Sequence, residues 1–255
     1  MRKQSYIAVC AIVVLGLALG AFAQQGAQNA APAAPGKAPK STTLLFREDF
    51  KTGKVGEVQL NQDAVTNPNL ELKLYGPGAK PGNADQSGLL LSNEADPTAP
   101  GTTESIVWTG VVQGNWAVLL KEKNNYLNLN DTARLRWRIR PRGFHELRPV
   151  IKLADGTMLA ADYSEPTSTY MRVSEIYFVD IPRWRALDPN TVAEARAKPG
   201  EGLWKYNVDL SKVDEIGFTD MMAGAGHGAQ GNIAVDWIEV YGNPVPRGTA
   251  QSELH

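Results

Sequence analysis

The sequence has almost no cysteine and little histidine. Its one cysteine is Cys10, near the start of the chain, and its three histidines are His145, His227 and His255. Because Cys10 lies in a segment that we expect to be removed, a cysteine nucleophile is excluded from the folded protein. A three-histidine zinc site is excluded as well, because His255 falls in a tail that we expect to be disordered.

The common catalytic motifs are also missing. The chain has no G-x-S-x-G sequence, and its glycine-rich loop Gly224–Gly228 lacks the lysine and Ser/Thr of a phosphate-binding loop. His227 in this loop is therefore expected to be a solvated loop residue rather than a base. The acids do not show the paired spacing of a glycosidase. A hydrolase with unpatterned acids, or a lyase using Tyr, Arg and His145 or His227, stays an alternative.

Neither sign of charge is in excess. The chain has 26 Lys and Arg against 27 Asp and Glu, a formal net charge of −1. Nucleic-acid binding depends on clustered Lys and Arg that neutralise phosphates. The sequence therefore predicts no nucleic-acid partner.

A long apolar run is found at the start of the chain. Arg2 and Lys3 precede an apolar stretch from Tyr6 to Leu19, and Ala21-Phe22-Ala23 has the small-x-small pattern of a signal-peptidase site. The stretch is shorter than the ~20 residues of a membrane-spanning helix. Residues 1–23 are interpreted as a signal peptide for export to the periplasm or beyond, with a permanent membrane anchor as the alternative. Without cysteine, the exported chain must be stabilised by core burial or a bound ion.

Composition divides the rest of the chain into three parts. Gln24–Lys40 is rich in Ala, Pro and Gln and has no large apolar residue, so we expect a disordered linker. This segment either tethers the folded part at a distance or is a plain disordered terminus. Residues 41–247 are expected to form one folded domain, and residues 248–255 a disordered tail.

The domain has many short β-prone runs between turn residues. Asp155-Gly156, between two such runs, is a strong hairpin signal. Two apolar runs within Tyr206–Gly242 flank the glycine-rich loop and are interpreted as the closing strands. The other expected strands include Thr42–Phe50, Leu70–Leu74, Gly88–Leu91, Ser105–Val111, Trp116–Leu120, Leu147–Leu153, Met158–Tyr163 and Tyr170–Ile181.

The clearest alternation lies in Ala133–Arg140. Its apolar residues fall on one side of a strand and its four arginines on the other, a period of two that no amphipathic helix gives. The arginine side is either a lattice of cross-strand ion pairs, with Glu146, Asp162 and Glu175 as partners, or a cleft for an acidic ligand.

One segment has the pattern of a helix. Asp188–Lys198 begins with an aspartate cap and Pro189, and Pro199-Gly200 follows it. Short strands with a single helix in an inserted loop predict an all-β, two-sheet antiparallel β-sandwich of the jelly-roll type.

Three sequences at the two ends of the domain carry a family resemblance. FREDF (Phe46–Phe50), DLSKVDEIGF (Asp209–Phe218) and NIAVDWIEVYG (Asn232–Gly242) together resemble galactose-binding-like β-sandwiches, the fold of many carbohydrate-binding modules. The middle of the domain is longer than in such modules. It leaves room for inserted loops or for another jelly-roll family, such as the concanavalin-like lectins and glucanases.

The resemblance implies a structural calcium ion. In the modules that this chain resembles, acids of the first and last strands often hold calcium, and by that analogy Glu48, Asp49 and Asp236 are the candidate ligands. Calcium binds six to eight oxygens, which carboxylates and loop carbonyls supply. The alternative is that these acids face water or cap turns.

Sugar recognition requires aromatic rings for the C–H faces and polar forks for the hydroxyls. We expect Trp108, Trp137 and Trp237 in the core, because a tryptophan in a sandwich is more often core than surface. The predicted ligand-binding residues are Trp184, Trp204, Arg136, Arg138, Arg183, Arg185 and Tyr163.

These patterns favour an exported, non-catalytic domain that binds a glycan or polysaccharide, with acidic glycans preferred. Aromatic rings next to guanidinium forks are the combination that recognises a sugar with a carboxylate or sulfate. The alternatives are a secreted jelly-roll glycoside hydrolase or polysaccharide lyase, and an envelope scaffold that binds protein.

Overall fold

The computed structural model describes residues 42–51, 57–80, 88–95, 103–109, 112, 114–195, 202–221 and 232–248. All of them belong to one compact unit, Pro39–His255. The expected signal peptide, the linker, the glycine-rich loop with His227 and residues 249–255 lie outside the described residues. Within the described ranges, no helix is long and apolar enough to cross a membrane.

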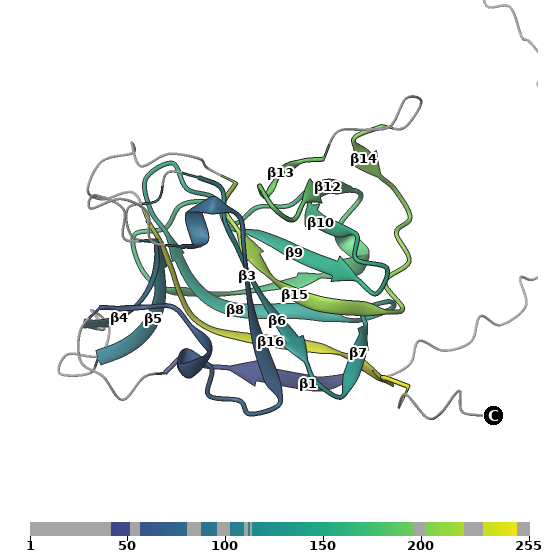
Figure 1. The fold of residues 1–255 in the computed structure, drawn as a ribbon, viewed down its shortest axis with the longest axis horizontal. Coiled ribbons are helices and arrows are strands. Elements are labelled where there is room, and N and C mark those ends of the chain that lie inside the picture. The colour runs from purple at the N-terminus through teal and green to yellow at the C-terminus, as the bar shows by residue number, and fades with distance from the viewer. Residues whose placement is uncertain are drawn as a thin grey trace, which may run out of the picture. The chain divides into compact units, whose positions relative to one another are not determined.

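One sheet, which we call sheet A, is built around the long last strand. In spatial order, its strands are β2 (Val58–Gln59), β4 (Leu89–Ala95), β5 (Thr103–Thr109) and β1 (Thr43–Glu48) on one side of β16 (Ile233–Pro246), and β8 (Arg134–Pro141) and β11 (Arg172–Tyr177) on its other side. Figure 1 shows β16 in yellow, running between β1 and β8.

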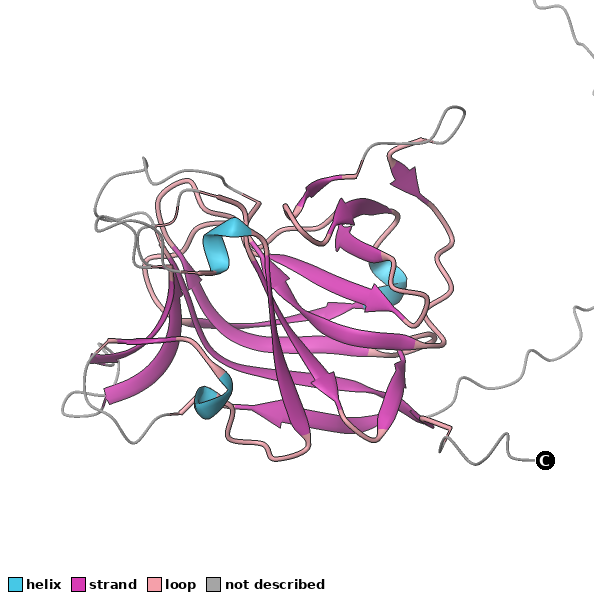
Figure 2. Cartoon of the chain, viewed as in Figure 1, coloured by secondary structure: helices cyan, strands magenta, loops and turns pink. Residues whose placement is uncertain are grey.

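The second sheet, sheet B, holds most of the middle of the chain. In spatial order, its strands are β3 (Leu70–Tyr75), β6 (Ala117–Glu122) with β7 (Asn125–Asn128), β15 (Val213–Thr219), β9 (Arg148–Leu153), β10 (Met158–Ala161), β12 (Trp184–Asp188), and β13 (Ala193–Glu194) with β14 (Trp204–Lys205). The last residues of β16 pair with β7 and so connect the two sheets. Every described pairing is antiparallel, which confirms the predicted all-β sandwich (Figure 2).

The main core lies between the two sheets. On β8, Leu135, Trp137 and Ile139 point into it and are fully buried, as the alternation predicts. Trp116 and Phe218 of sheet B meet edge to face in the same core, with ring centroids 6.1 Å apart. Burial of such large side chains supplies the stability that disulfides do not.

The predicted hairpin at Asp155-Gly156 is confirmed. It joins β9 to β10, and the amide of Leu153 donates to the carbonyl of Thr157 at 2.9 Å. Gly156 has a φ of 89°, a conformation that glycine adopts without strain. The carboxylate of Asp155 accepts from the amide of Thr157, which closes the turn.

The predicted helix over Asp188–Lys198 is wrong for the residues that the structure describes. Asp188 ends β12 and, after a turn, Ala193 and Glu194 form β13, which pairs back onto β12. Asp188 does cap an amide, that of Asn190, but it closes a turn. Val192 is fully buried against sheet B, and this packing outweighs local helix propensity. Helical geometry in the described residues is limited to 3-10 turns: η1 (Gln62–Ala64), η2 (Pro77–Ala79) and η3 (Phe178–Asp180).

Candidate binding site

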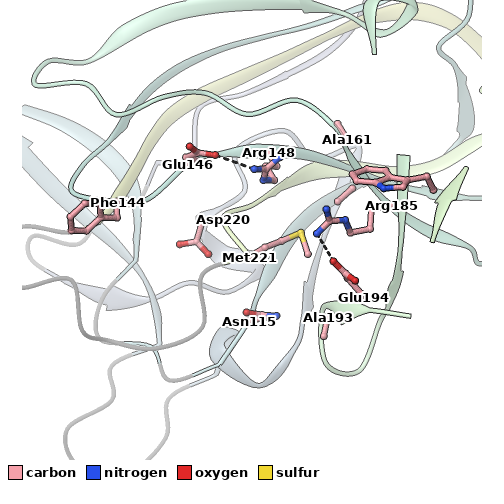
Figure 3. Close-up of a pocket in the computed structure, with 12 residues that line it drawn as sticks. Asn115, Phe144, Glu146, Arg148, Ala161, Arg185, Ala193, Glu194, Asp220 and Met221 are labelled. Atoms are coloured by element: carbon pink, nitrogen blue, oxygen red, sulfur yellow. Dashed lines mark hydrogen bonds and ion pairs between the residues drawn. The ribbon is translucent and has the colours of Figure 1, made fainter. Parts of the chain in front are cut away.

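A pocket of about 550 Å³ lies over the outer face of sheet B, the face turned away from the main core. This volume is within the ~300–1,000 Å³ range of small-molecule sites. In Figure 3, Phe144 lies on one side of the pocket and Arg185 with Glu194 on the other, with Asp220 and Met221 between them. Strand ends and loops of sheet B therefore supply most of the lining.

The hollow exists because the outer face of sheet B carries small side chains. Alternate residues of β10 point to opposite faces: Leu159 enters the main core, while Ala160 faces outward and lines the pocket. Ala193 on β13 lines it as well. Larger side chains at these positions would fill the space.

Two ion pairs line opposite parts of the pocket. Arg148 donates to Glu146 at 3.0 Å, and Arg185 lies 2.5 Å from Glu194 (Figure 3). The acids are the more exposed partners, with side chains 49% and 41% exposed against 29% and 33% for the arginines. Pairs this exposed contribute about 0–1 kcal/mol. A ligand oxygen can therefore replace either glutamate at small cost.

Trp204 supports two arginines, Arg183 just before β12 and Arg185 within it. The guanidinium carbons of Arg183 and Arg185 lie 4.0 and 4.5 Å from the centroid of its ring. Arg183 also pairs with Asp162 at 2.5 Å. Because these guanidiniums lie over the indole, Trp204 holds Arg185 in the pocket wall, and its covered ring surface is not open to a sugar.

Phe144 is a largely exposed aromatic side chain of the pocket. It follows Gly143, which has a φ of 69°, in the turn between β8 and β9, and it is 76% exposed. Sequence reasoning missed Phe144 and Arg148, since of the residues that line this pocket it predicted only Arg185 and Trp204 as ligand-binding. The available signal was a phenylalanine in a Pro-Arg-Gly-Phe turn, where a core side chain is not expected.

A buried histidine and aspartate lie at the pocket wall. Nδ1 of His145 is 2.8 Å from Oδ2 of Asp220, and both side chains are almost completely buried. Asp220 directly follows β15 and lines the pocket. His145, a candidate catalytic residue of the lyase alternative, is thus held in place by the buried carboxylate of Asp220.

The structure brings together only part of the predicted ligand-binding set. Arg185 and Trp204 line the pocket, and Arg183 stacks on Trp204. Trp184 is a correction: its side chain is 3% exposed and belongs to the main core, because the residue alternates with its two arginine neighbours along β12. Tyr163 packs partly against the main core, and its hydroxyl donates to Glu165 at 3.1 Å.

The predicted arginine face lies on the other side of the sandwich. Arg134, Arg136 and Arg138 point outward from sheet A and pair with acids of neighbouring strands, whereas Arg140 is buried. Arg136 contacts Glu239 at 3.2 Å, and Arg138 contacts Asp236 at 2.8 Å and also Glu104. Of the two alternatives for this face, the structure therefore shows the lattice of cross-strand ion pairs, in which the predicted partner Glu175 pairs with Arg134. The β8 arginines do not line the pocket that contains Arg185.

Trp237 is buried in an unexpected way. It is 8% exposed but lies outside the main core cluster, beneath Arg47 and Arg136, whose guanidinium carbons are 4.4 and 5.4 Å from its ring centroid. Trp137 is in the core as predicted, while Trp108 is only partly buried. Arginine stacking can thus bury a tryptophan on an outer sheet face.

The structure separates one of the three predicted calcium ligands, Glu48, from the other two. Glu48 is completely buried, and its carboxylate accepts from the amides of Phe50, Thr66 and Asn67. Asp49 and Asp236 line a second pocket, of about 470 Å³, on the outer face of sheet A. Burial raises the pKa of Asp236 despite its bond to Arg138. Among the described residues, no group of three or more His, Cys, Asp or Glu is arranged to hold a metal ion. Calcium binding stays a prediction.

Comparison with known proteins gives structural similarities at low identity. No family model and no curated protein matches the chain. A family 11 carbohydrate-binding module from Clostridium thermocellum, solved with a beta-1,3-1,4-mixed-linked tetrasaccharide, is similar over 76% of this chain and 99% of that chain, with 17% identity and a TM-score of 0.40. An exo-beta-agarase is similar over 80% of this chain and 25% of its own, with 15% identity and a TM-score of 0.40. These scores are too low to establish shared ancestry or function, so the sandwich is assigned from this chain's own strand pairing.

Proposed function

We propose that this chain is a non-catalytic carbohydrate-binding protein and that the pocket over sheet B is its binding site. The observation that carries the proposal is Phe144, an aromatic side chain 76% exposed on one side of a pocket whose other side carries arginine and glutamate. A sugar ring stacks its C–H face on such a ring while its hydroxyls bond to charged side chains.

We also propose that acidic glycans are preferred. A sugar carboxylate or sulfate forms a two-pronged contact with a guanidinium, which a neutral hydroxyl does not. Arg148 and Arg185 are the guanidiniums of the pocket, and their present partners are half-exposed glutamates. An acidic group on the ligand takes the place of Glu146 on Arg148 or of Glu194 on Arg185, and the displaced glutamate becomes fully hydrated.

An external location fits this role. The leader-like sequence of residues 1–23 supports export, and polysaccharides are found mainly outside the cytoplasm. The exported protein would meet its ligand in the periplasm or outside the cell.

Binding is tested by calorimetry against soluble polysaccharides, among them polygalacturonate and its neutral methyl ester. We expect polygalacturonate to bind more tightly than the ester, with the difference shrinking as salt screens the charges. Phe144→Ala should weaken binding to both by about tenfold or more, because the stacking surface is lost. Arg148→Ala should mainly reduce the difference between them.

The matched control is Tyr170→Ala. Tyr170 is also exposed, at 60%, but it does not line the pocket, so its removal should leave binding unchanged. The proposal fails if no polysaccharide binds, or if Phe144→Ala and Arg148→Ala bind like the unaltered protein. Shortening of the polysaccharide during incubation would instead identify an enzyme.

A further inference from the structure

Val192, beside the pocket, has a strained backbone. Its φ is 50°, in the left-handed region, where a β-branched residue is a genuine outlier. Its side chain is fully buried in the cluster on the outer face of sheet B, with Leu187 and Met158. Strain of this kind persists only where the surrounding contacts impose it, and it is common at binding sites.

Asn115 supplies one of those contacts. Its side-chain Nδ2 donates to the carbonyl of Val192 at 2.9 Å, across 77 residues of sequence. On the other side of the turn, the amide of Val192 donates to the carbonyl of Asp188 at 2.8 Å. The two bonds hold Val192 from both ends, so the turn keeps its position over sheet B.

Asn115 is itself fixed by close packing. Its backbone carbonyl accepts from the amide of Gly78 at 3.0 Å. A Cβ on Gly76 would lie 2.4 Å from that carbonyl oxygen and 2.7 Å from Cγ2 of Val192. Only glycine at position 76 lets these three segments meet.

Burying the side-chain amide of Asn115 costs stability, and its one hydrogen bond, to the carbonyl of Val192, must offset that cost. With Nδ2 committed to Val192, Oδ1 is buried and has no hydrogen-bond partner among the residues that the structure describes. A buried acceptor without a partner destabilises the fold. An apolar side chain of the same shape would avoid this cost, so the contribution of Asn115 is the bond to Val192.

The residues after Val192 form a wall of the pocket. Ala193 and Glu194 line the pocket, and Glu194 pairs with Arg185. We infer that Asn115 is a positioning residue for this site: its bond to Val192 fixes β13, whose Ala193 and Glu194 form the pocket wall beside Arg185. This inference rests on the proposed glycan-binding function.

The test is Asn115→Leu, which keeps the shape of the side chain and removes its polar atoms. The amide of Ala195, which donates to Ala186 at 2.9 Å, reports on the wall by hydrogen exchange. We expect its exchange to speed up about tenfold and polygalacturonate binding to weaken about tenfold, with a small fall in melting temperature, because removal of Oδ1 offsets part of the loss at the Val192 carbonyl. A merely structural asparagine would lower the melting temperature without speeding up exchange at Ala195.

Rescue and control variants complete the test. Val192→Gly, added to Asn115→Leu, should recover binding while lowering the melting temperature, because glycine adopts this φ without strain but fills no space. Asn190→Ala, in the same turn but exposed, should leave exchange and binding as they are. If Asn115→Leu does not fold, Asn115→Ala replaces it.

The outcomes separate the two proposals. Unchanged exchange at Ala195 in the folded Asn115 variant overturns the positioning role, whatever the ligand. Faster exchange in a protein that binds no polysaccharide supports the fixed wall and overturns the glycan-binding function.

Discussion

Glu48 is an acid that the sequence assigned to calcium and that the fold uses as an anchor. It accepts at 2.8–3.0 Å from the amides of Phe50, Thr66 and Asn67, and also from the hydroxyl of Thr66. Glu48→Ala leaves the buried amide of Phe50 and the partly buried donors of Thr66 and Asn67 without the carboxylate. We expect the free energy of unfolding to fall by about 3–5 kcal/mol in urea titrations.

Glu71→Ala is the control, because Glu71 is a half-exposed acid paired only with Lys73 among the described residues and should change stability little. A small effect of Glu48→Ala would mean that water replaces the carboxylate. The same samples, melted in chelator and in excess calcium, test the calcium prediction: a bound ion raises the melting temperature by mass action.

Aromatic residues occur both in protein cores and at binding surfaces, and this limits how well the site could be predicted from the sequence. Trp184 and Trp204 carry similar arginine neighbours in sequence or space, but one is core and the other supports the pocket wall. Only the face of sheet B on which each side chain falls, Trp184 from β12 and Trp204 from β14, separates them. Phe144 was not predicted as a binding-site residue, because the exposure of an aromatic side chain in a turn depends on which segments pack over that turn.

Strand β8 has the clearest alternation in the sequence. We expect that its outward-facing arginines do not contribute to polysaccharide binding. Arg138 lies on sheet A among Asp236 and Glu104, away from the pocket of Arg148. Arg138→Ala should leave polygalacturonate affinity unchanged. It should lower the free energy of unfolding by about 1–3 kcal/mol, because Asp236 loses its partner in a mostly buried position.

Calorimetry and urea titration of the same variant separate these effects, with Arg148→Ala as the matched arginine within the pocket. A loss of affinity in Arg138→Ala without a change in stability would move the binding site to sheet A.

Elements whose pattern is local were predicted well, and those decided by tertiary contacts were not. The β9–β10 hairpin follows from Asp155-Gly156, which closes its turn by its own chemistry. The segment after Asp188 has good helix signals, but Val192 finds a buried site on sheet B only if the chain turns back as β13. A single sequence does not contain that partner surface.

At the scale of the whole molecule, the fold class follows from the sequence and the sheet membership does not. The two closing strands, β15 and β16, are neighbours in sequence but lie in different sheets, β15 beside β9 and β16 beside β8. Each pairs with strands far away in the chain, and similar β-prone runs compete for those positions. The pocket follows from this arrangement, because it needs β9, β10 and β12 side by side.

The C-terminal end of the domain is held to β6 and β15 by an ionic cluster that predicts how stability changes in acid. Asp214 of β15 accepts from Lys121 of β6 at 3.1 Å and from Arg247, whose Nε donates to the carbonyl of Glu122 at 3.1 Å. Burial alone would raise the pKa of Asp214, but the bonds from Arg247 and Lys121 outweigh it and hold the pKa below its usual 3.8.

A carboxyl group with a lowered pKa stabilises the fold when it is ionised. The contribution of Asp214 is therefore complete well above pH 3.8 and is lost as the pH falls through 3.8 toward its lower value in the fold. Asp214→Asn should cost about 1–2 kcal/mol at pH 7, and this difference should shrink as the pH falls below 3.8, measured by urea unfolding at each pH. The raised pKa of Asp236 works in the opposite direction, but it is common to both proteins and cancels in the difference. A gap between the two proteins that stays constant from pH 7 to pH 3 would show that Asp214 acts by shape rather than by charge.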